Sequence, residues 1–160
     1  QREIKLCKVE LHGGSRMAIR LIIADLDGTL SDYGHRISLY KNKDYDAFNK
    51  AGINDKPIEN ICNIIRMLND DETEIVIMTA RDSGCRADTE KWLKANDVPY
   101  SRLLMRPKGD HSPDPVCKQK LLEDHIDYKD VWFVLEDRKS VVDMWRGEGL
   151  TCLQVAPGDF

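Results

Sequence analysis

The chain lacks a long hydrophobic run, a cysteine pair and an excess of positive charge. No apolar stretch approaches the roughly 18 to 20 residues that a helix needs to span a bilayer, and no signal pattern opens the sequence. The five cysteines are scattered without a C-x-x-C pair, which favours free thiols in a reducing compartment. We therefore expect a cytoplasmic protein that uses neither a membrane anchor nor disulfides.

Charge and length restrict the function further. The 160 residues carry 24 Lys and Arg against 28 Asp and Glu, a net charge of −4, and a hydrophobic fraction of 41% is typical of a globular domain. A chain of this size buries roughly 70% of its extended surface, enough for one core without metal or disulfide support. The negative net charge argues against a protein that coats nucleic acid by bulk charge. It still permits a basic mouth, meaning a local group of basic residues at the entrance of a site.

Residues 1–16 are set apart from the rest. They end in a Gly-Gly-Ser turn signal before Met17, where the strongest apolar run begins. Two interpretations stay open: an N-terminal extension that adds a strand, or a segment that precedes the natural start. Residues 17–160 are then the main domain, with no internal repeat.

Short apolar runs alternate with amphipathic stretches over the rest of the chain. The runs predict strands over Ala18–Ala24, Glu74–Met78, Ser101–Met105, Val131–Leu135 and Thr151–Val155. Helices are predicted over Ile58–Leu68, Arg86–Ala95, Pro115–His125 and Ser140–Arg146, the first with Pro57 in its opening turn and an apolar face of Ile58, Ile61, Ile64, Ile65 and Leu68. This alternation predicts an α/β, Rossmann-like fold with a central parallel sheet, helices on both faces and a site at the strands' carboxyl ends.

The first predicted strand is followed by Asp25-Leu26-Asp27-Gly28-Thr29. A carboxylate such as Asp25 can act as a covalent nucleophile toward a phosphoryl group. Asp27, two residues on, points the same way and can protonate the leaving oxygen and then deprotonate water. Gly28 permits the sharp turn that exposes both groups. The alternative is a simple turn or helix cap.

Further strand ends carry polar groups suited to the same chemistry. Thr79 and Arg81 can bind phosphate oxygens, unless they only cap a helix and face solvent. Glu136 and Asp137 offer oxygen ligands for Mg²⁺, unless they only favour a helix N-terminus. Lys118 or its neighbour Lys120 must offset the surplus of negative charge.

Together these motifs resemble the haloacid dehalogenase (HAD) superfamily of Mg²⁺-dependent phosphatases. Over Leu21 to Phe160 the chain is similar to the 3′-phosphatase domain of bacteriophage-type polynucleotide kinase/phosphatase. The matching stretches are ADLDGTLSDYGHR, Arg81 to Gly84, Asp114 to Lys118, EDR, VVDMWR and QVAPGDF. The resemblance implies phosphate release through an aspartyl-phosphate, with a 3′-phosphorylated DNA or RNA end, or a nucleotide, as substrate.

The resemblance also assigns roles. The catalytic residues are Asp25, Asp27, Thr79 and Lys118; the substrate-binding residues are Arg36, Arg81 and Asp114; and the Mg²⁺ ligands are Asp25, Asp27 and Asp137, with Glu136 less secure. Two departures stand out. The chain has no G-x-x-x-x-G-K-[ST] loop, so 5′-kinase activity is not expected. Its acidic pair is Glu-Asp rather than Asp-Asp.

The stretch from Leu30 to Pro57 bears on the substrate, because it is only about one short hairpin or helix long and predicts at most a minimal cap. An open mouth suits a polynucleotide end. Basic residues supply a candidate mouth, with a solvated loop and helix face as the alternative; they are Arg36, Arg81, Arg102, Arg106, Lys108, His111, Lys118 and Lys120. A phosphatase of small phosphate esters and a non-catalytic module that binds nucleic-acid ends remain competing hypotheses.

Overall fold

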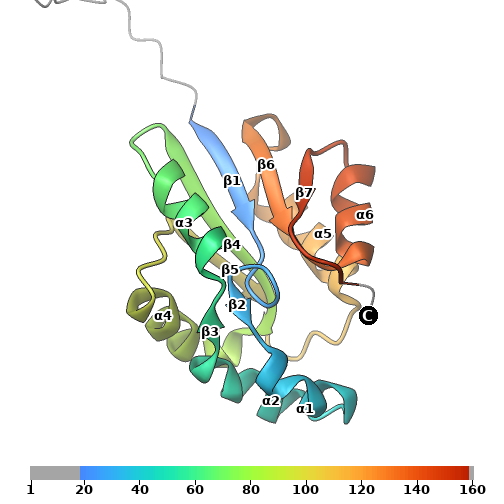
Figure 1. Cartoon of the computed structure of the whole chain (residues 1–160). Coiled ribbons are helices and arrows are strands. Elements are labelled where there is room, and N and C mark those ends of the chain that lie inside the picture. Colours follow the sequence, from blue (N-terminus) through green and yellow to red (C-terminus); the bar gives the residue numbers. More distant parts are fainter. Residues whose placement is uncertain (1–18, 159–160) are drawn as a thin grey trace, which may run out of the picture.

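A five-stranded parallel sheet forms the centre of the computed structural model, which describes residues 19–158 (Figure 1). The strand order is β5-β4-β1-β6-β7. The bounds are β1 Arg20–Ala24, β4 Thr73–Asp82, β5 Arg102–Arg106, β6 Val131–Glu136 and β7 Cys152–Gln154. Because β1 pairs with both β4 and β6, its carboxyl end lies where the strand order reverses, the usual position of a ligand site in such sheets. The predicted α/β fold is confirmed.

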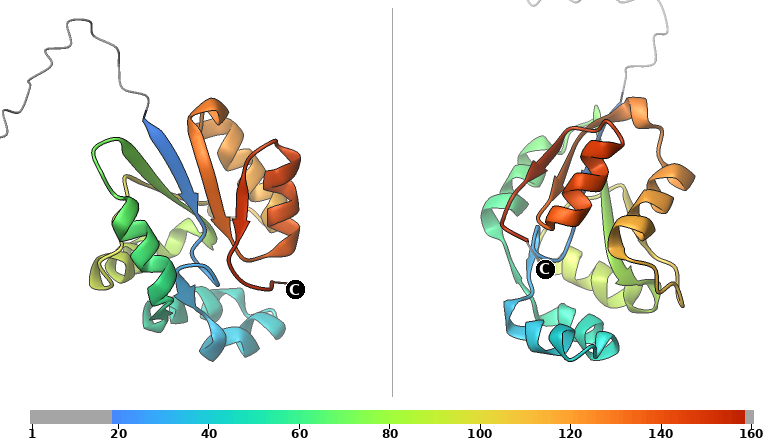
Figure 2. Two further views of the ribbon diagram at one scale, coloured as in Figure 1. Left: turned by 45° about the horizontal axis from the view of Figure 1, so that its top comes forward. Right: turned by 90° about the vertical axis from the view of Figure 1, so that its right-hand side faces the viewer.

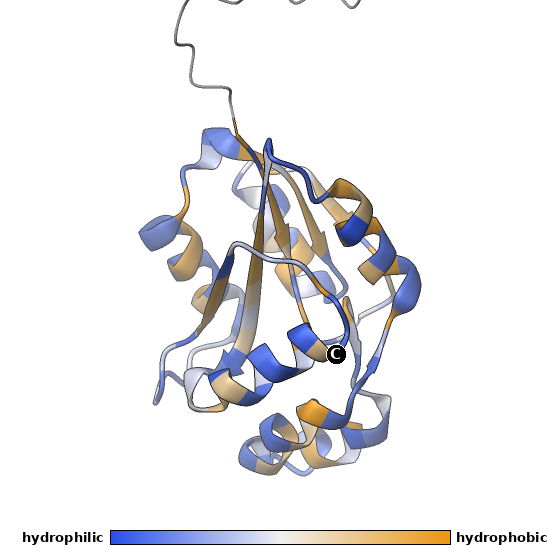
Figure 3. Ribbon diagram, turned by 90° about the vertical axis from the view of Figure 1, so that its left-hand side faces the viewer, coloured by the Kyte–Doolittle hydropathy of each residue, from blue (hydrophilic) through white to orange (hydrophobic). Residues whose placement is uncertain are grey.

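Helices cover both faces of this sheet (Figure 2). On one face lie α3 Glu59–Leu68 and α4 Arg86–Ala95, and on the other lie α5 Asp114–His125 and α6 Lys139–Gly147. Each face has its own buried apolar cluster, one around Ile22 and Ile77 and one around Ile23 and Val134. The hydropathy colouring in Figure 3 shows strands that are apolar in their middle parts and hydrophilic at some of their ends, as expected of a sheet covered on both faces.

The start of α3 differs from the prediction. Pro57 lies in the two-residue strand β3 (Lys56–Pro57), and the helix begins at Glu59. Its buried residues are Cys62 and Ile65, whereas Ile64 is 39% exposed. The predicted inclusion of Ile64 in the apolar face was therefore wrong, because the helix turns Cys62 toward the sheet in its place.

Strand β4 is longer than the predicted Glu74–Met78. After a register shift, its pairing with β5 resumes at Asp82 opposite Arg106. Thr79 and Arg81 therefore belong to an extended strand end and are both buried. Buried polar side chains in a strand must find partners, so this extension directs them into the site.

Residues between β1 and α3 form a small cap below the carboxyl ends of the strands (Figure 1). The antiparallel pair of β2 Ser31–Asp32 with β3 holds its two ends together. Between them lie the 3₁₀ turn Gly34–Arg36, α1 Ile37–Lys41, α2 Tyr45–Ala51 and the 3₁₀ turn Gly52–Asn54. The cap thus has a strand pair and two short helices, more than the single hairpin or helix predicted, although it remains minimal.

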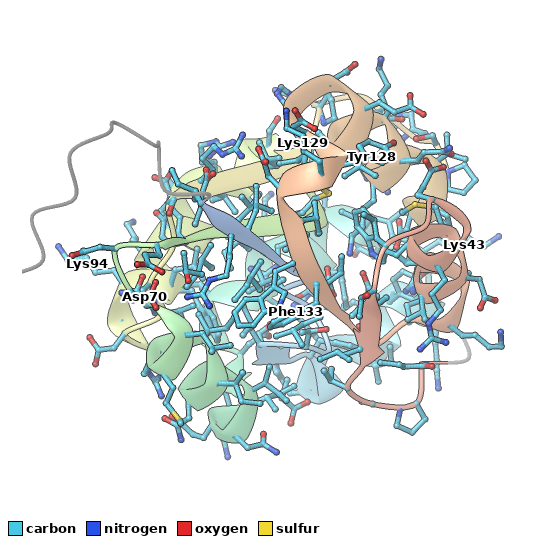
Figure 4. The ribbon with its side chains drawn as sticks, turned by 90° about the horizontal axis from the view of Figure 1, so that it is seen from above. Lys43, Asp70, Lys94, Tyr128, Lys129 and Phe133 are labelled. Carbon is cyan, nitrogen blue, oxygen red and sulfur yellow. The ribbon has the colours of Figure 1, made fainter. Side chains whose placement is uncertain are left out.

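The remaining short elements lie outside the cap. Further 3₁₀ turns span Ser83–Cys85 and Tyr128–Asp130. Seen from the amino ends of the strands, Phe133 on β6 faces the side that α3 covers (Figure 4), where it packs against the first apolar cluster. Within residues 19–158, no helix is long and apolar enough to cross a membrane. The predictions for residues 1–16 fall outside the described residues.

Candidate active site

The turn after β1 brings Asp25 and Asp27 to the edge of the sheet. The Asp25 backbone N–H donates to the Leu135 carbonyl at 3.0 Å, which joins the ends of β1 and β6. Gly28 follows with a φ of +88°, and a Cβ there would lie 2.2 Å from Asp137 Oδ2. Glycine is required at this position both by the backbone conformation and by the approach of Asp137.

Three carboxylates meet beside this turn. Asp25, Glu136 and Asp137 are buried, and each offers an oxygen within 4.8 Å of the others. Hard oxygen ligands from carboxylates are those that Mg²⁺ prefers. The donor set therefore fits Mg²⁺, and Glu136, the less secure residue in the sequence, is a full member. The Asp27 carboxylate does not belong to this cluster and instead binds arginine.

Lys118 from α5 lies against the cluster. Its Nζ donates to Asp25 Oδ1 at 2.5 Å and to Glu136 Oε2 at 2.7 Å. Burial alone would lower the pKa of Lys118, but the two carboxylates outweigh it and hold the pKa above its ordinary value. Lys118 is therefore a fixed cation that touches the predicted nucleophile, as the sequence anticipated, while Lys120 pairs with Asp124 on the exposed side of α5.

The clustered carboxylates repel one another in the absence of a metal. Burial, followed by the charge of Glu136, raises the pKa of Asp25 well above its ordinary value, while Lys118 lowers it. The same two causes raise the pKa of Asp137 to about 6. A divalent cation at this point would relieve the repulsion and favour the ionised carboxylates.

Asp27 has a different environment from Asp25. Arg81 binds it with two groups, Nη2 to Oδ1 at 2.6 Å and Nε to Oδ2 at 3.0 Å, and Arg36 Nη2 also donates to Oδ1. Burial would raise the pKa of Asp27, but Arg81 and then Arg36 hold it well below its usual range. Two carboxylates two residues apart therefore have opposite electrostatic settings, one against a lysine and further acids and one against two arginines.

Asp55, which sequence reasoning missed, completes this arginine network from the end of the cap. Its side chain is fully buried and accepts from Arg36 Nε at 2.7 Å, from Arg36 Nη2 at 2.5 Å and from Arg81 Nη2 at 3.0 Å. His35 Nε2 lies 2.8 Å from the same carboxylate. Asp55 thus holds both guanidiniums beside Asp27. An isolated Asp before Lys-Pro gives no sequence signal for this role.

The remaining predicted residues lie around the same pocket. Thr79 is buried at its wall, and its hydroxyl accepts from the Arg81 backbone N–H at 3.2 Å. Asp114 at the start of α5 accepts from Arg106 Nη2 at 2.6 Å and from Arg138 Nη1 at 2.5 Å. Asp114 is therefore occupied by two arginines in this structure, an arrangement that suits a residue that orients cations.

The C-terminal segment holds Asp137 in place. Gln154 Nε2 donates to the Asp137 carbonyl at 2.9 Å, and the Lys139 N–H donates to the Gly158 carbonyl at 2.9 Å. A Cβ on Gly158 would lie 2.5 Å from the Asp137 carbonyl oxygen. These contacts give Gln154 and Gly158 of the QVAPG stretch a structural role at the site.

A pocket of about 890 Å³ opens over these groups. Its walls come from the end of β1, the end of β4, the cap and the loop before α5. Asp25, Asp27, Thr79, Arg81 and Lys118 all line it. Arg36 instead lies beneath it, almost completely buried behind Asp27.

The predicted basic mouth forms only in part, because Arg81, Arg106, His111 and Lys118 are the predicted residues that line the pocket. Arg102 pairs with Glu74, and neither it nor Lys108 or Lys120 lines the pocket. Arg36, Arg81, Arg106 and Lys118 are each bound to carboxylates. Net charge in the sequence does not reveal this pairing, which depends on strands and helices far apart in the chain.

Comparison with known proteins identifies the family of the chain. Residues 19–160 match the family described as "Polynucleotide kinase PNKP phosphatase domain". A protein of Autographa californica nuclear polyhedrosis virus, named "Putative bifunctional polynucleotide kinase/RNA ligase", is 32% identical over 130 residues, which are 79% of this chain and 18% of the viral protein.

Solved structures show the same relationship. A chain in the "Structure of Pnkp1/Rnl/Hen1 complex" is 31% identical, with a TM-score of 0.80 over 99% of this chain and 53% of that one. A predicted phosphatase from Clostridium acetobutylicum, 14% identical with a TM-score of 0.64, matches 85% of this chain and 84% of its own, and shares the fold. The chain spans about half the length of the first structure and less than a fifth of the viral relative. By these matches the chain belongs to the PNKP phosphatase-domain family of HAD phosphatases.

Proposed function

We propose that this domain removes the 3′-phosphate from polynucleotide ends, using Mg²⁺ and an aspartyl-phosphate on Asp25. The observation that carries the proposal is the environment of Asp25, a buried carboxylate that contacts Lys118, adjoins two further acids and lines a pocket shared with Asp27 and Arg81. A simple turn or helix cap needs no such surroundings. The polynucleotide substrate is inferred from the family to which the domain belongs.

In the first step, an Asp25 carboxylate oxygen forms a bond to phosphorus and the bond to the 3′-oxygen breaks. Asp27 gives its proton to that leaving oxygen. In the second step, Asp27 takes a proton from water, whose oxygen attacks phosphorus and releases inorganic phosphate from Asp25. Mg²⁺ held by Asp25, Glu136 and Asp137 would offset the negative charge of substrate and nucleophile.

The arginines around Asp27 give its protonation a physical route. In the structure they bind the Asp27 carboxylate and hold its pKa low. A phosphate dianion in the pocket competes for the same donors, because Arg81 lines that pocket and can bind phosphate with both arms of its guanidinium. Donors that turn to the phosphate no longer hold the Asp27 pKa down, so substrate binding itself favours the acid form.

Lys118 and Thr79 complete the phosphate environment. The ammonium of Lys118 is fixed by Asp25 and Glu136, so it orients the nucleophile and faces the incoming phosphoryl oxygens. Thr79 contributes a hydroxyl from the end of β4. Because the 160 residues hold no G-x-x-x-x-G-K-[ST] loop, we assign no 5′-kinase chemistry to them.

The test is hydrolysis of a 3′-phosphorylated oligonucleotide by the purified chain with Mg²⁺ and with EDTA. We expect Asp25→Asn to abolish turnover, because an amide cannot form the acyl phosphate, and Asp124→Asn on the exposed side of α5 to retain it. Rapid acid quenching with labelled substrate should trap phosphate on the wild-type protein and not on Asp25→Asn. Near-normal turnover by Asp25→Asn would refute the mechanism.

The second candidate is a phosphatase of mononucleotides or other small phosphate esters. The size of the pocket favours it, because about 890 Å³ suffices for a nucleotide. Comparing kcat/KM for a 3′-phosphorylated oligonucleotide and a 3′-mononucleotide separates the two. A much higher value for the mononucleotide would reject the polynucleotide assignment.

A further inference from the structure

The pocket has more room than a phosphate group needs. One water molecule takes about 30 Å³ in the liquid, so 890 Å³ corresponds to many more atoms than a phosphate contains. Cavities of about 300 to 1,000 Å³ hold complete organic ligands. The space beside Asp25 therefore accommodates a large part of the leaving group as well.

Aromatic side chains from the cap form one wall of this space. Tyr40 of α1 and Tyr45 and Phe48 of α2 all line the pocket. The Tyr40 and Tyr45 rings pack edge to face with centroids 5.6 Å apart, and the Tyr40 and Phe48 centroids are 5.4 Å apart. Tyr45 is nevertheless 51% exposed. An aromatic ring kept half exposed at the wall of a pocket is available for a flat ligand.

The charge of the same pocket is negative. Among the residues described, nine Asp and Glu line it against five Lys and Arg. Arg81, Arg106, Lys118 and Arg138 are each paired with a carboxylate. Lys43 is the one lining Lys or Arg for which residues 19–158 provide no ion pair. A bound divalent cation would reduce the excess of negative charge without reversing it.

These observations are opposite to what a strand-binding groove requires. Proteins that hold single strands by the backbone use a positively charged groove, and their affinity falls steeply with salt. Stacking of bases on aromatic rings contributes without a positive groove and tolerates any base, because every base has a π-face.

We propose that Tyr45, backed by Tyr40 and Phe48 in this aromatic wall, stacks the base of the terminal nucleotide, and that the strand beyond this nucleotide is not held by its phosphates. This inference rests on the proposed function, since it concerns the leaving group of the same reaction. The cap thereby selects a nucleoside 3′-phosphate and is indifferent to the length of the polynucleotide attached to it.

The first test varies the base and the ring. Substrates are a 3′-phosphorylated dinucleotide and its analogue with an abasic terminal sugar. Removing one base–aromatic stack should lower kcat/KM by roughly 5- to 150-fold, so we expect Tyr45→Ala to show that loss on the normal substrate and none on the abasic one. Tyr45→Phe keeps the ring and should retain activity. Tyr100→Ala, a partly exposed tyrosine outside the pocket, is the matched control. Equal losses on both substrates would overturn the proposal.

The second test needs no variant. We expect kcat/KM of the wild-type chain to be similar for 3′-phosphorylated mono-, di- and decanucleotides. The slope of log kcat/KM against log salt should differ by less than about one between the mono- and decanucleotide, whereas a grip on four extra phosphates would add a slope of about −3. A steep rise with length together with a steeper salt slope would overturn the inference. Absence of hydrolysis of every 3′-phosphate would instead reject the proposed function.

Discussion

Removing the charge of Asp55 should destabilise the whole domain. In Asp55→Asn, the amide keeps one acceptor oxygen and turns an NH₂ group toward guanidinium donors. Arg36 and Arg81, whose side chains are 1% and 2% exposed, then share the single carboxylate of Asp27. Breaking a buried ion pair by removing one partner costs about 3 to 5 kcal/mol of unfolding free energy.

This cost is a large fraction of the domain's total free energy of unfolding. Domains unfold with roughly 5 to 15 kcal/mol, and a chain of this length loses about 2 to 4 °C of Tm for each kcal/mol. Together with the cost of the buried pair, this predicts a Tm lower by about 6 to 20 °C. Urea titration and thermal melting, both followed by circular dichroism, measure the two quantities.

The control is Asp124→Asn, which removes the ion-pair partner of Lys120 on the surface. The side chains of Asp124 and Lys120 are 50% and 70% exposed. Exposed pairs contribute about 0 to 1 kcal/mol, so its Tm should stay near that of the wild type. Asp55→Asn should also lose about 10²-fold in kcat/KM at a temperature where it is folded, because the arginines beside Asp27 lose their fixed positions. A loss of unfolding free energy no larger than that of the control would refute the argument that Asp55 holds the two arginines.

Two further predictions concern the turn after β1. Gly28→Ala should cost about 1 to 3 kcal/mol in backbone strain and should weaken Mg²⁺ binding in titration calorimetry, because the new Cβ meets Asp137. The control is Gly149→Ala, where the φ of +81° is also positive but the new Cβ enters open space. Equal loss of Mg²⁺ affinity in the two variants would contradict the role of the Gly28–Asp137 contact. For Asp27, whose pKa is lower in the folded state, the stabilisation is present at pH above the unfolded value of about 3.9 and is lost as the pH falls below it. The gap in unfolding free energy between wild type and Asp27→Asn should narrow between about pH 4 and pH 2, and a gap that stayed constant in urea titrations would count against the arginine pairing.

Local sequence patterns determined the layout of the chain. β-branched apolar runs predicted the three central strands β1, β4 and β6, because strands buried on both faces leave no polar alternation. The edge strands β5 and β7 were predicted from less continuous apolar segments. The helix predicted over Arg86–Ala95 is confirmed at both ends. The Asp25-x-Asp27-Gly28 turn indicated the site, since its chemistry and its backbone conformation are encoded within four neighbouring residues.

Tertiary structure decided which charged groups meet. Asp55 is 30 residues from Asp25 in the chain, and only the folding of the cap brings it to Arg36 and Arg81. The same packing pairs the basic residues that the sequence suggested for a mouth, and it leaves an aromatic wall beside an acidic pocket. Composition sets how many charges the chain carries, whereas burial and distance set which of them neutralise one another.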